Sequence, residues 1–288
     1  MDLNLRRRFF AEELEAVCKL QSSALVDAFA AVPREQFLRP GPWTVLADVD
    51  FMGPARTRST PDADPARVYH NIAVAIDPSR QLFNGQPGTL GVWIDALGLT
   101  AGARVLHVGC GLGYYTAVMA HCVGARGGVV AFEVDDALAT EARQNLAPLA
   151  WVDVRHGDAS TIDGRFDAIL VNAGVTHPLD AWLDALGDGG RMILPLTSAM
   201  PAMGATLGKG LVIALTKQNA TDYTARVLAP VAVYSAVGLR DDSMNERLGK
   251  AMMAGPMKWA AVKRLRRDQH DEADTCWLHR PRGCLSTA

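Results

Sequence analysis

The sequence lacks the features of a membrane-spanning or secreted protein. No apolar run in its 288 residues is long enough to cross a bilayer. The first ten residues, MDLNLRRRFF, carry charges but are not followed by the apolar segment of a secretory signal. We therefore expect a cytoplasmic protein that does not associate with a membrane.

Cysteine is scarce, and its spacing forms no framework. The five cysteines are Cys18, Cys110, Cys122, Cys276 and Cys284, an odd number without any Cys-x-x-Cys pair. This pattern favours reduced thiols over disulfides. Cys276, His279 and Cys284 have side chains that can bind metal, but no fourth partner stands nearby in the sequence. The sequence therefore predicts no metal site.

An excess of charge of either sign is also missing. The chain has 29 basic and 31 acidic residues, for a net charge of −2. This balance does not favour nucleic acid or an anionic membrane as a partner. The basic run at 263–267, KRLRR, is interpreted as a solvated helix face, with an acidic partner as the alternative. Hydrophobic residues make up 49% of the chain, enough for a sizeable core.

The most informative stretch is 105–117, VLHVGCGLGYYTA. It predicts a buried strand, a turn containing Gly109, Gly111 and Gly113, and a helix. Glycine allows a ligand to approach the backbone closely, and a helix start presents free N–H groups. The dinucleotide fingerprint needs glycine or alanine where this chain has Tyr114. The polar His107 precedes the turn, a pattern similar to the first motif of S-adenosylmethionine (SAM) dependent methyltransferases.

Two acidic residues follow at the ends of later predicted strands. Glu133 ends an apolar strand about 20 residues after the turn, where a carboxylate can accept hydrogen bonds from a ribose diol. Its alternative role is a solvated strand-end carboxylate. Asp158 follows the third strand, where an aspartate usually meets the adenine amino group in this fold. Its alternative role is a helix N-cap or turn residue.

The alternation of strands and helices predicts the fold class. Strands are expected at 104–108, 129–134, 152–155, 167–172 and 191–195, with helical segments between them. This order indicates an α/β protein with a doubly wound, mostly parallel sheet. The segment 184–190 is interpreted as a helix end and turn, and 211–216 and 225–235 as an antiparallel pair at the sheet edge.

The remaining segments are expected outside this sheet. Residues 5–38 are predicted to be helical, 39–67 irregular, 242–267 helical, and the last ten residues frayed.

Several segments together resemble the protein-L-isoaspartate O-methyltransferase family, from about residue 20 to 197. They are AFAAVPREQF at 28–37, VYHN at 68–71, GQP at 85–87, the glycine turn, HGD at 156–158, FDAILV at 166–171 and GGRMILP at 189–195. The resemblance implies a Rossmann-like class I methyltransferase fold with SAM as cofactor. The cofactor-binding residues it implies are Gln86, His107, Gly109, Cys110, Gly111, Gly113, Tyr114, Glu133, Val134, Asp158 and Ala159.

The resemblance also suggests how the chain is divided. We expect an N-terminal helical segment and irregular arm at 1–67, a SAM-binding methyltransferase domain at 68–238, and a C-terminal helical tail at 239–288.

The part of the chain expected to bind the methyl acceptor departs from this family. The family usually has Ser or Thr where this chain has Gly85, preceded by Asn84, and residues 77–79 are inserted before this point. Asn84 and Gly85 are therefore the candidate substrate-binding residues. Asn172 and His177 follow the fourth strand and are the candidate catalytic residues. Asn172 could position a substrate carbonyl, and His177 could bind a carboxylate or act as a base, unless both merely cap their loop.

The predicted function is methyl transfer from SAM to a carboxylate of a protein, peptide or small molecule. An ionised carboxylate needs no general base, and the sequence shows no evident catalytic dyad. The Asn-Pro-Pro-Tyr type motif of methyltransferases that act on nucleic acid bases is absent. The alternatives are a nicotinamide-dependent oxidoreductase and a SAM-binding module without catalysis. The sequence specifies neither the acceptor nor the oligomeric state, and Gly85 predicts weak isoaspartyl methylation.

Overall fold

The computed structural model describes residues 2–46, 57–199 and 207–288. The chain forms two compact units. The first comprises residues 1–103 and 110–156, and the second comprises residues 104–109 and 157–288.

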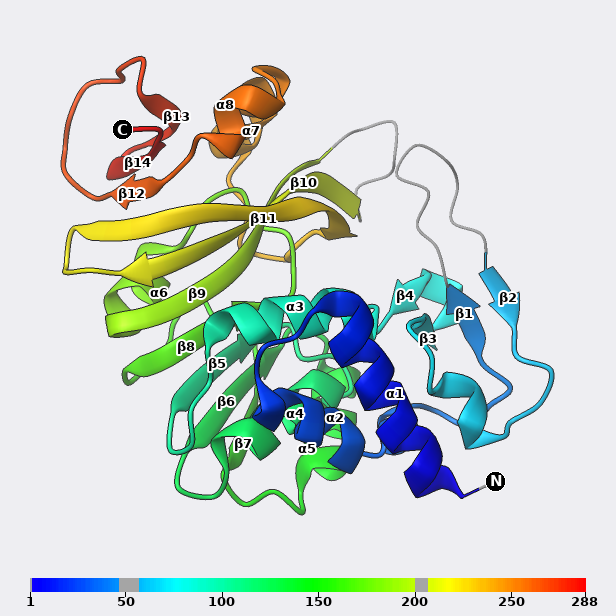
Figure 1. The fold of residues 1–288 in the computed structure, drawn as a ribbon. Coiled ribbons are helices and arrows are strands. Elements are labelled where there is room, and N and C mark those ends of the chain that lie inside the picture. The colour runs from blue at the N-terminus through cyan, green and yellow to red at the C-terminus, as the bar shows by residue number, and fades with distance from the viewer. Residues whose placement is uncertain (1, 47–56, 200–206) are drawn as a thin grey trace. The chain divides into compact units, whose positions relative to one another are not determined.

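The first unit begins with two helices, α1 (Leu3–Cys18) and α2 (Ser23–Ala31), which pack on each other (Figure 1). Side-chain oxygens of Asp2 and Ser22 cap their N-termini. Phe10 and Phe29 are fully buried and meet edge to face, with ring centroids 6.3 Å apart. The helix expected over 5–38 is interrupted, because Lys19 takes a left-handed conformation. A 3-10 turn, η1 (Arg34–Phe37), follows Pro33.

A small antiparallel sheet follows in the same unit. Its strands lie in the order β2 (Thr57–Ser59), β1 (Thr44–Leu46), β3 (Ala73–Asp77) and β4 (Leu82–Phe83), with 3-10 turns η2 (Pro65–Val68) and η3 (Pro78–Arg80). The described part of 39–67 is therefore not wholly irregular, since it contributes β1 and β2. The rest, 47–56, lies outside the described residues. β4 leads into helix α3 (Pro87–Leu97) through residues 84–86.

The first unit also contains a parallel strand pair, β6 (Gly128–Glu133) and β7 (Val152–His156). Helix α5 (Asp136–Leu146) connects them, and helix α4 (Tyr114–Val123) precedes them. These elements confirm the strands and helices predicted between 114 and 155. Val129 and Ala131 of β6 are almost completely buried, as expected for a strand of a parallel α/β sheet.

The second unit contains a sheet with the strand order β13-β14-β12-β11-β10-β9-β8-β5. β5 (Arg104–Val108), β8 (Phe166–Val171) and β9 (Leu186–Ala199) are parallel. Helix α6 (Asp180–Ala185) ends within 184–190, as predicted, but it leads directly into β9, so the turn predicted there is wrong. The α/β class and the mostly parallel arrangement of the predicted strands are confirmed.

Two long strands continue this sheet, β10 (Leu207–Lys217) and β11 (Asp222–Tyr234), visible as the long hairpin in Figure 1. They pair antiparallel, as predicted, but they do not form the edge. Three further strands, β12 (Arg264–Arg266), β13 (Cys276–Arg280) and β14 (Gly283–Ser286), extend the sheet beyond β11.

The expected helical tail is therefore only partly correct. Helices α7 (Asp242–Met253) and α8 (Pro256–Ala260) form, and then the chain turns into strands. Leu265, Leu278 and Leu285 are buried in this part of the sheet, which explains why the segment is neither helical nor frayed. Part of the basic run lies on β12, where Arg264 pairs with Asp222 at 2.5 Å.

None of the helices in the described ranges is both long and apolar enough to cross a membrane.

Candidate functional site

The glycine turn has the conformation that its sequence predicts. Gly109, Gly111 and Gly113 have φ angles of 81°, 55° and 95°, which side chains disfavour. A Cβ on Gly113 would lie 2.7 Å from Leu146 Cδ1. Gly113 is the N-cap of α4 and makes no side-chain cap hydrogen bond. The turn therefore leaves backbone N–H groups at the start of a helix available to a ligand.

Glu133 is joined to this turn within the first unit. Its Oε2 accepts a hydrogen bond from the Gly111 amide at 2.8 Å, and its Oε1 accepts one from the Asp135 amide at 3.1 Å. The residue is only 8% exposed. Burial raises the pKa of Glu133 above its usual 4.5, and the backbone hydrogen bonds oppose that rise. Because each carboxylate oxygen has two lone pairs, Glu133 can brace the turn and still accept a hydrogen bond from a ligand.

Three predicted cofactor residues around the turn have buried side chains. His107 is fully buried in β5, and burial lowers its pKa to about 3, so its imidazole is neutral. Burial raises the pKa of the Cys110 thiol, which points to a small packing residue rather than a nucleophile. Tyr114 packs against Phe29 and Phe37. These positions can contact a cofactor through their backbone, and their side chains build the core beside it.

Val134 follows Glu133 and is 39% exposed, so it presents apolar surface next to the carboxylate. An apolar surface suits contact with an adenine ring, and the neighbouring carboxylate suits hydrogen bonds with the ribose. The role of Val134 remains a prediction.

The predicted adenine-binding turn, Asp158 and Ala159, belongs to the second unit. The Asp158 carboxylate accepts a hydrogen bond from the Ser160 amide at 2.8 Å, and its pKa is lowered by hydrogen bonds with Ser160. Ala159 has a φ of 60°, uncommon for a residue with a side chain. Its carbonyl accepts a hydrogen bond from the indole N–H of the fully buried Trp182 at 2.9 Å. Helix α6 thus holds this turn in a strained conformation.

The candidate substrate loop, residues 84–86, lies in the first unit. Asn84 Oδ1 accepts hydrogen bonds from the Val74 amide at 2.9 Å and from Arg34 at 3.3 Å, so this oxygen is used in building the loop. Its Nδ2 is buried and has no hydrogen-bond partner among the described residues. Gln86 Nε2 lies 3.5 Å from the Asn71 carbonyl. Asn84 is thus a structural residue of this loop, and its buried amide donor has no partner there.

Gly85 has a φ of 78°, and a Cβ there would lie 2.8 Å from Leu90 Cδ2. A serine at this position would be strained in this loop conformation. The departure from the family pattern is therefore built into the local backbone.

The two candidate catalytic residues belong to the second unit. The backbone N–H of Asn172 donates to the Val108 carbonyl at 2.8 Å, and the side-chain Nδ2 of Asn172 lies 3.5 Å from the Gly109 carbonyl. His177 Nδ1 lies 3.0 Å from the Thr176 hydroxyl. Burial, followed by the positive charge of Arg280, lowers the pKa of His177. The imidazole is therefore neutral at physiological pH and can offer a hydrogen bond but no positive charge.

Sequence reasoning missed the residues that hold these loops in place. The Tyr115 hydroxyl donates to the Gly85 carbonyl at 3.0 Å. Asn71 Oδ1 accepts from the Gly88 amide at 2.8 Å, and Asn145 Nδ2 donates to the Leu112 carbonyl at 3.0 Å. All three side chains form hydrogen bonds with backbone groups. Every residue has such groups, so the sequence does not indicate which of them will be bound.

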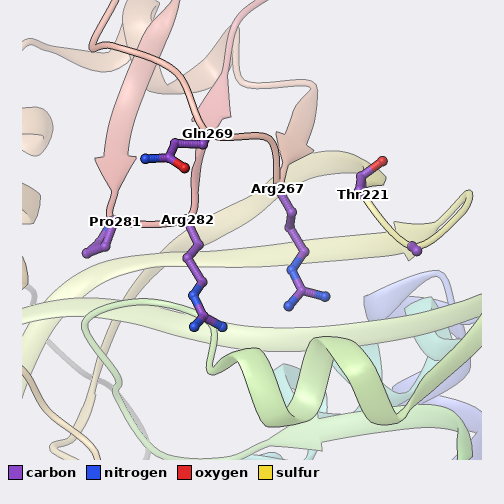
Figure 2. A pocket seen from close by; sticks show the side chains of 6 residues that line it. Thr221, Arg267, Gln269, Pro281 and Arg282 are labelled. Carbon is purple, nitrogen blue, oxygen red and sulfur yellow. The ribbon is translucent and has the colours of Figure 1, made fainter.

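A hollow of about 420 Å³ lies elsewhere, in the second unit, beside the C-terminal strands (Figure 2). Arg267 and Arg282 extend along it, as a site for an anion would require. However, Arg267 pairs with Asp184 at 2.5 Å and with Asp180 at 3.3 Å, and Arg282 lies 3.6 Å from Asp180. These acidic partners offset the arginine charge, so the hollow is a weak candidate for an acceptor carboxylate.

A parallel α/β fold, a turn of three left-handed glycines and a carboxylate at the next strand end are the features expected of a class I SAM-dependent methyltransferase. The family model for protein-L-isoaspartate(D-aspartate) O-methyltransferase matches residues 7–206. The chain therefore belongs to this family.

Individual relatives agree with this assignment. Protein-L-isoaspartate O-methyltransferase 1 of Rhodopseudomonas palustris is 30% identical over 81% of this chain and 83% of its own length. The enzyme of Thermotoga maritima is 29% identical over 61% of this chain, and the match spans only 51% of that relative. A family structure from Plasmodium falciparum, solved with S-adenosyl-L-homocysteine, superposes with a TM-score of 0.58 at 18% identity. The match covers 80% of this chain and 97% of the Plasmodium falciparum chain, and it confirms the fold.

Proposed function

We propose that this protein transfers a methyl group from SAM to a carboxylate of a protein or peptide. The observation that carries the proposal is the hydrogen bond from the Gly111 amide to Glu133, within a turn whose three glycines all have positive φ. The match to the family over residues 7–206 supports it. It also makes a nicotinamide-dependent oxidoreductase the weaker alternative.

The residues present fit SAM. Glu133 would accept hydrogen bonds from the ribose hydroxyls, and Val134 would pack against the base. The amides at the start of α4 would meet the carboxylate of the methionine part, because helix N-termini favour anions. SAM supplies a methyl group that its sulfonium already activates, so the protein contributes orientation and exclusion of water.

The acceptor chemistry follows from what the chain offers. A carboxylate is ionised at neutral pH and attacks without a base. The neutral imidazole of His177 suits a hydrogen-bond donor better than a proton acceptor, and Asn172 of the same unit offers a side-chain amide. In the first unit, the side-chain amides of Asn84 and Gln86 are the donors that we propose for acceptor binding.

We further propose that ordinary isoaspartyl repair is weak in this protein. The hydroxyl expected by family resemblance is missing at Gly85, and the backbone there resists its introduction. A hydrogen bond to a charged group contributes about 1.5–3 kcal/mol, so its loss would lower turnover by roughly one to two orders of magnitude.

The direct experiment compares methyl transfer to an isoaspartyl peptide and to its aspartyl twin. Weak transfer to the isoaspartyl peptide supports the proposal. Efficient and selective transfer to the isoaspartyl peptide would show that glycine at position 85 does not weaken catalysis. The activity would then be ordinary isoaspartyl repair. Binding of SAM without transfer to any peptide or metabolite carboxylate would instead indicate a module that has no catalytic activity.

We also propose a cytoplasmic location. All five cysteines are free thiols, which suits a reducing compartment.

A further inference from the structure

The C-terminal strands bring together a cluster of sulfur and nitrogen ligands that the sequence separates. His270, Cys276 and Cys284 each offer one ligand atom, and these atoms all lie within 4.8 Å of one another. Cys276 Sγ lies 3.0 Å from Cys284 Sγ and 3.3 Å from His270 Nε2. Cys284 is fully buried, and the other two are half-buried.

His279 is the candidate for a fourth ligand, because it lies next to two of these residues. His279 is the cross-strand partner of Cys284 in the β13–β14 hairpin. Its ring lies edge-on to that of His270, with centroids 5.1 Å apart. Its Nδ1 is buried and has no hydrogen-bond partner among the described residues. The side chain thus has an unused nitrogen within a cluster of metal-binding groups.

Local hydrogen bonds orient His270 in the way that metal-binding histidines require. Its Nδ1 lies 2.8 Å from the carbonyl oxygen of Asp268, which can only accept a hydrogen bond. Nδ1 is therefore the protonated nitrogen, and the lone pair of Nε2 faces Cys276. A histidine that binds metal nearly always donates its other N–H to such a carbonyl or carboxylate.

We propose that His270, Cys276, His279 and Cys284 bind one Zn²⁺ ion. Two thiolates and two imidazoles form a Cys₂His₂ set, which zinc binds tetrahedrally in structural sites. Calcium and magnesium prefer oxygen ligands and do not suit this set. Zinc–sulfur bonds of about 2.3 Å place tetrahedral sulfurs about 3.8 Å apart, so binding would separate the two Sγ atoms by less than about 1 Å.

A metal here would join the loop after β12 to the hairpin β13–β14. All four ligands lie beyond residue 206, where the family match ends. The site would stabilise a structural element outside the family match, and the proposal does not depend on the methyltransferase activity.

The first test is metal content. We expect about one zinc per full-length chain after expression with zinc supplied, as measured by plasma mass spectrometry. Cys276→Ser and His270→Gln should lose most of this zinc. Cys18→Ser, a matched change of a half-buried thiol in α1, should keep it. Equal zinc in Cys276→Ser and Cys18→Ser would overturn the proposal.

The second test needs no variant to fold. Cobalt(II) is titrated into the reduced, metal-free native chain. A tetrahedral thiolate site produces a near-ultraviolet charge-transfer band and strong visible bands, both of which zinc removes. If these bands do not appear, the proposal fails. A Cys276–Cys284 disulfide in the purified protein, with no cobalt bound after its reduction, would overturn the proposal in favour of a redox pair.

Discussion

Glu133 accepts a hydrogen bond from the Gly111 amide of the glycine turn, and we propose that it binds the ribose of SAM. Glu133→Gln keeps the volume but removes the charge, so we expect SAM affinity to fall about 10- to 150-fold, the equivalent of 1.5–3 kcal/mol. Calorimetry with SAM measures this change. Glu12→Gln, an exposed carboxylate on α1, is the control and should bind SAM as the native chain does. Unchanged affinity in a folded Glu133→Gln variant would refute the ribose assignment.

The pH dependence of SAM binding tests the same residue. Because burial raises the pKa of Glu133 above 4.5, the carboxyl gains its proton at a higher pH than an exposed glutamate does. The protonated form loses its charge and an acceptor, so affinity should fall as the pH is lowered through this raised pKa. The decline should be flatter in Glu133→Gln. An identical pH profile in the two proteins would mean that another group controls binding.

Substitutions at Gly85 should change the stability of the protein as well as its specificity. A residue with a side chain in the left-handed region costs about 1–2 kcal/mol, and the contact with Leu90 adds to that. Gly85→Ala and Gly85→Ser should both lower the melting temperature by several degrees. Only Gly85→Ser should raise isoaspartyl methylation relative to Gly85→Ala, since the two differ by one hydroxyl. Equal methylation by both variants would exclude a role for that hydroxyl.

Among the elements, helix α4 contacts both candidate binding segments. It begins at the glycine turn, and its Tyr115 binds the candidate acceptor loop at 84–86. Tyr115→Phe leaves the Gly85 carbonyl without its donor, which costs about 1–3 kcal/mol. We expect lower kcat/KM with nearly unchanged SAM affinity. Tyr223→Phe is the matched control, because that buried hydroxyl also donates to a backbone carbonyl, that of Leu183, at 2.9 Å. Similar turnover in the two variants would show that Tyr115 contributes stability alone.

Local patterns predict the parallel strands and the glycine turn well. Apolar runs such as 129–132, VVAF, favour buried strands, and three alternating glycines before a helix leave few other conformations. The C-terminal strands escape prediction because β12 is three residues long and its burial depends on β14, twenty residues away.

The candidate site shows the same contrast. Glu133 can be predicted because it ends a strand at a known spacing from the glycine turn. The Tyr115–Gly85 contact cannot, because it joins residues 30 positions apart through a backbone carbonyl. His270 is missed as a ligand because only the folded loop places it beside Cys276.

For the whole molecule, the charges are nearly balanced, with a net charge of −2. Long-range attraction therefore contributes little to the capture of an acidic acceptor. We expect KM for a peptide acceptor to change by less than about threefold between low and physiological salt. Initial-rate measurements at several ionic strengths check this. A steep rise of KM with salt would reveal a charged docking surface.

The central claim is that this chain esterifies carboxylates with SAM. The most direct measurement incubates the native protein with methyl-labelled SAM and a peptide pool, and then tests whether the label is released by mild base. We predict base-labile label, as from a methyl ester, that is lost when the peptide carboxyls are amidated beforehand. Base-stable label that persists on amidated peptides would contradict the account, because the methyl group would then be on nitrogen, sulfur or a hydroxyl.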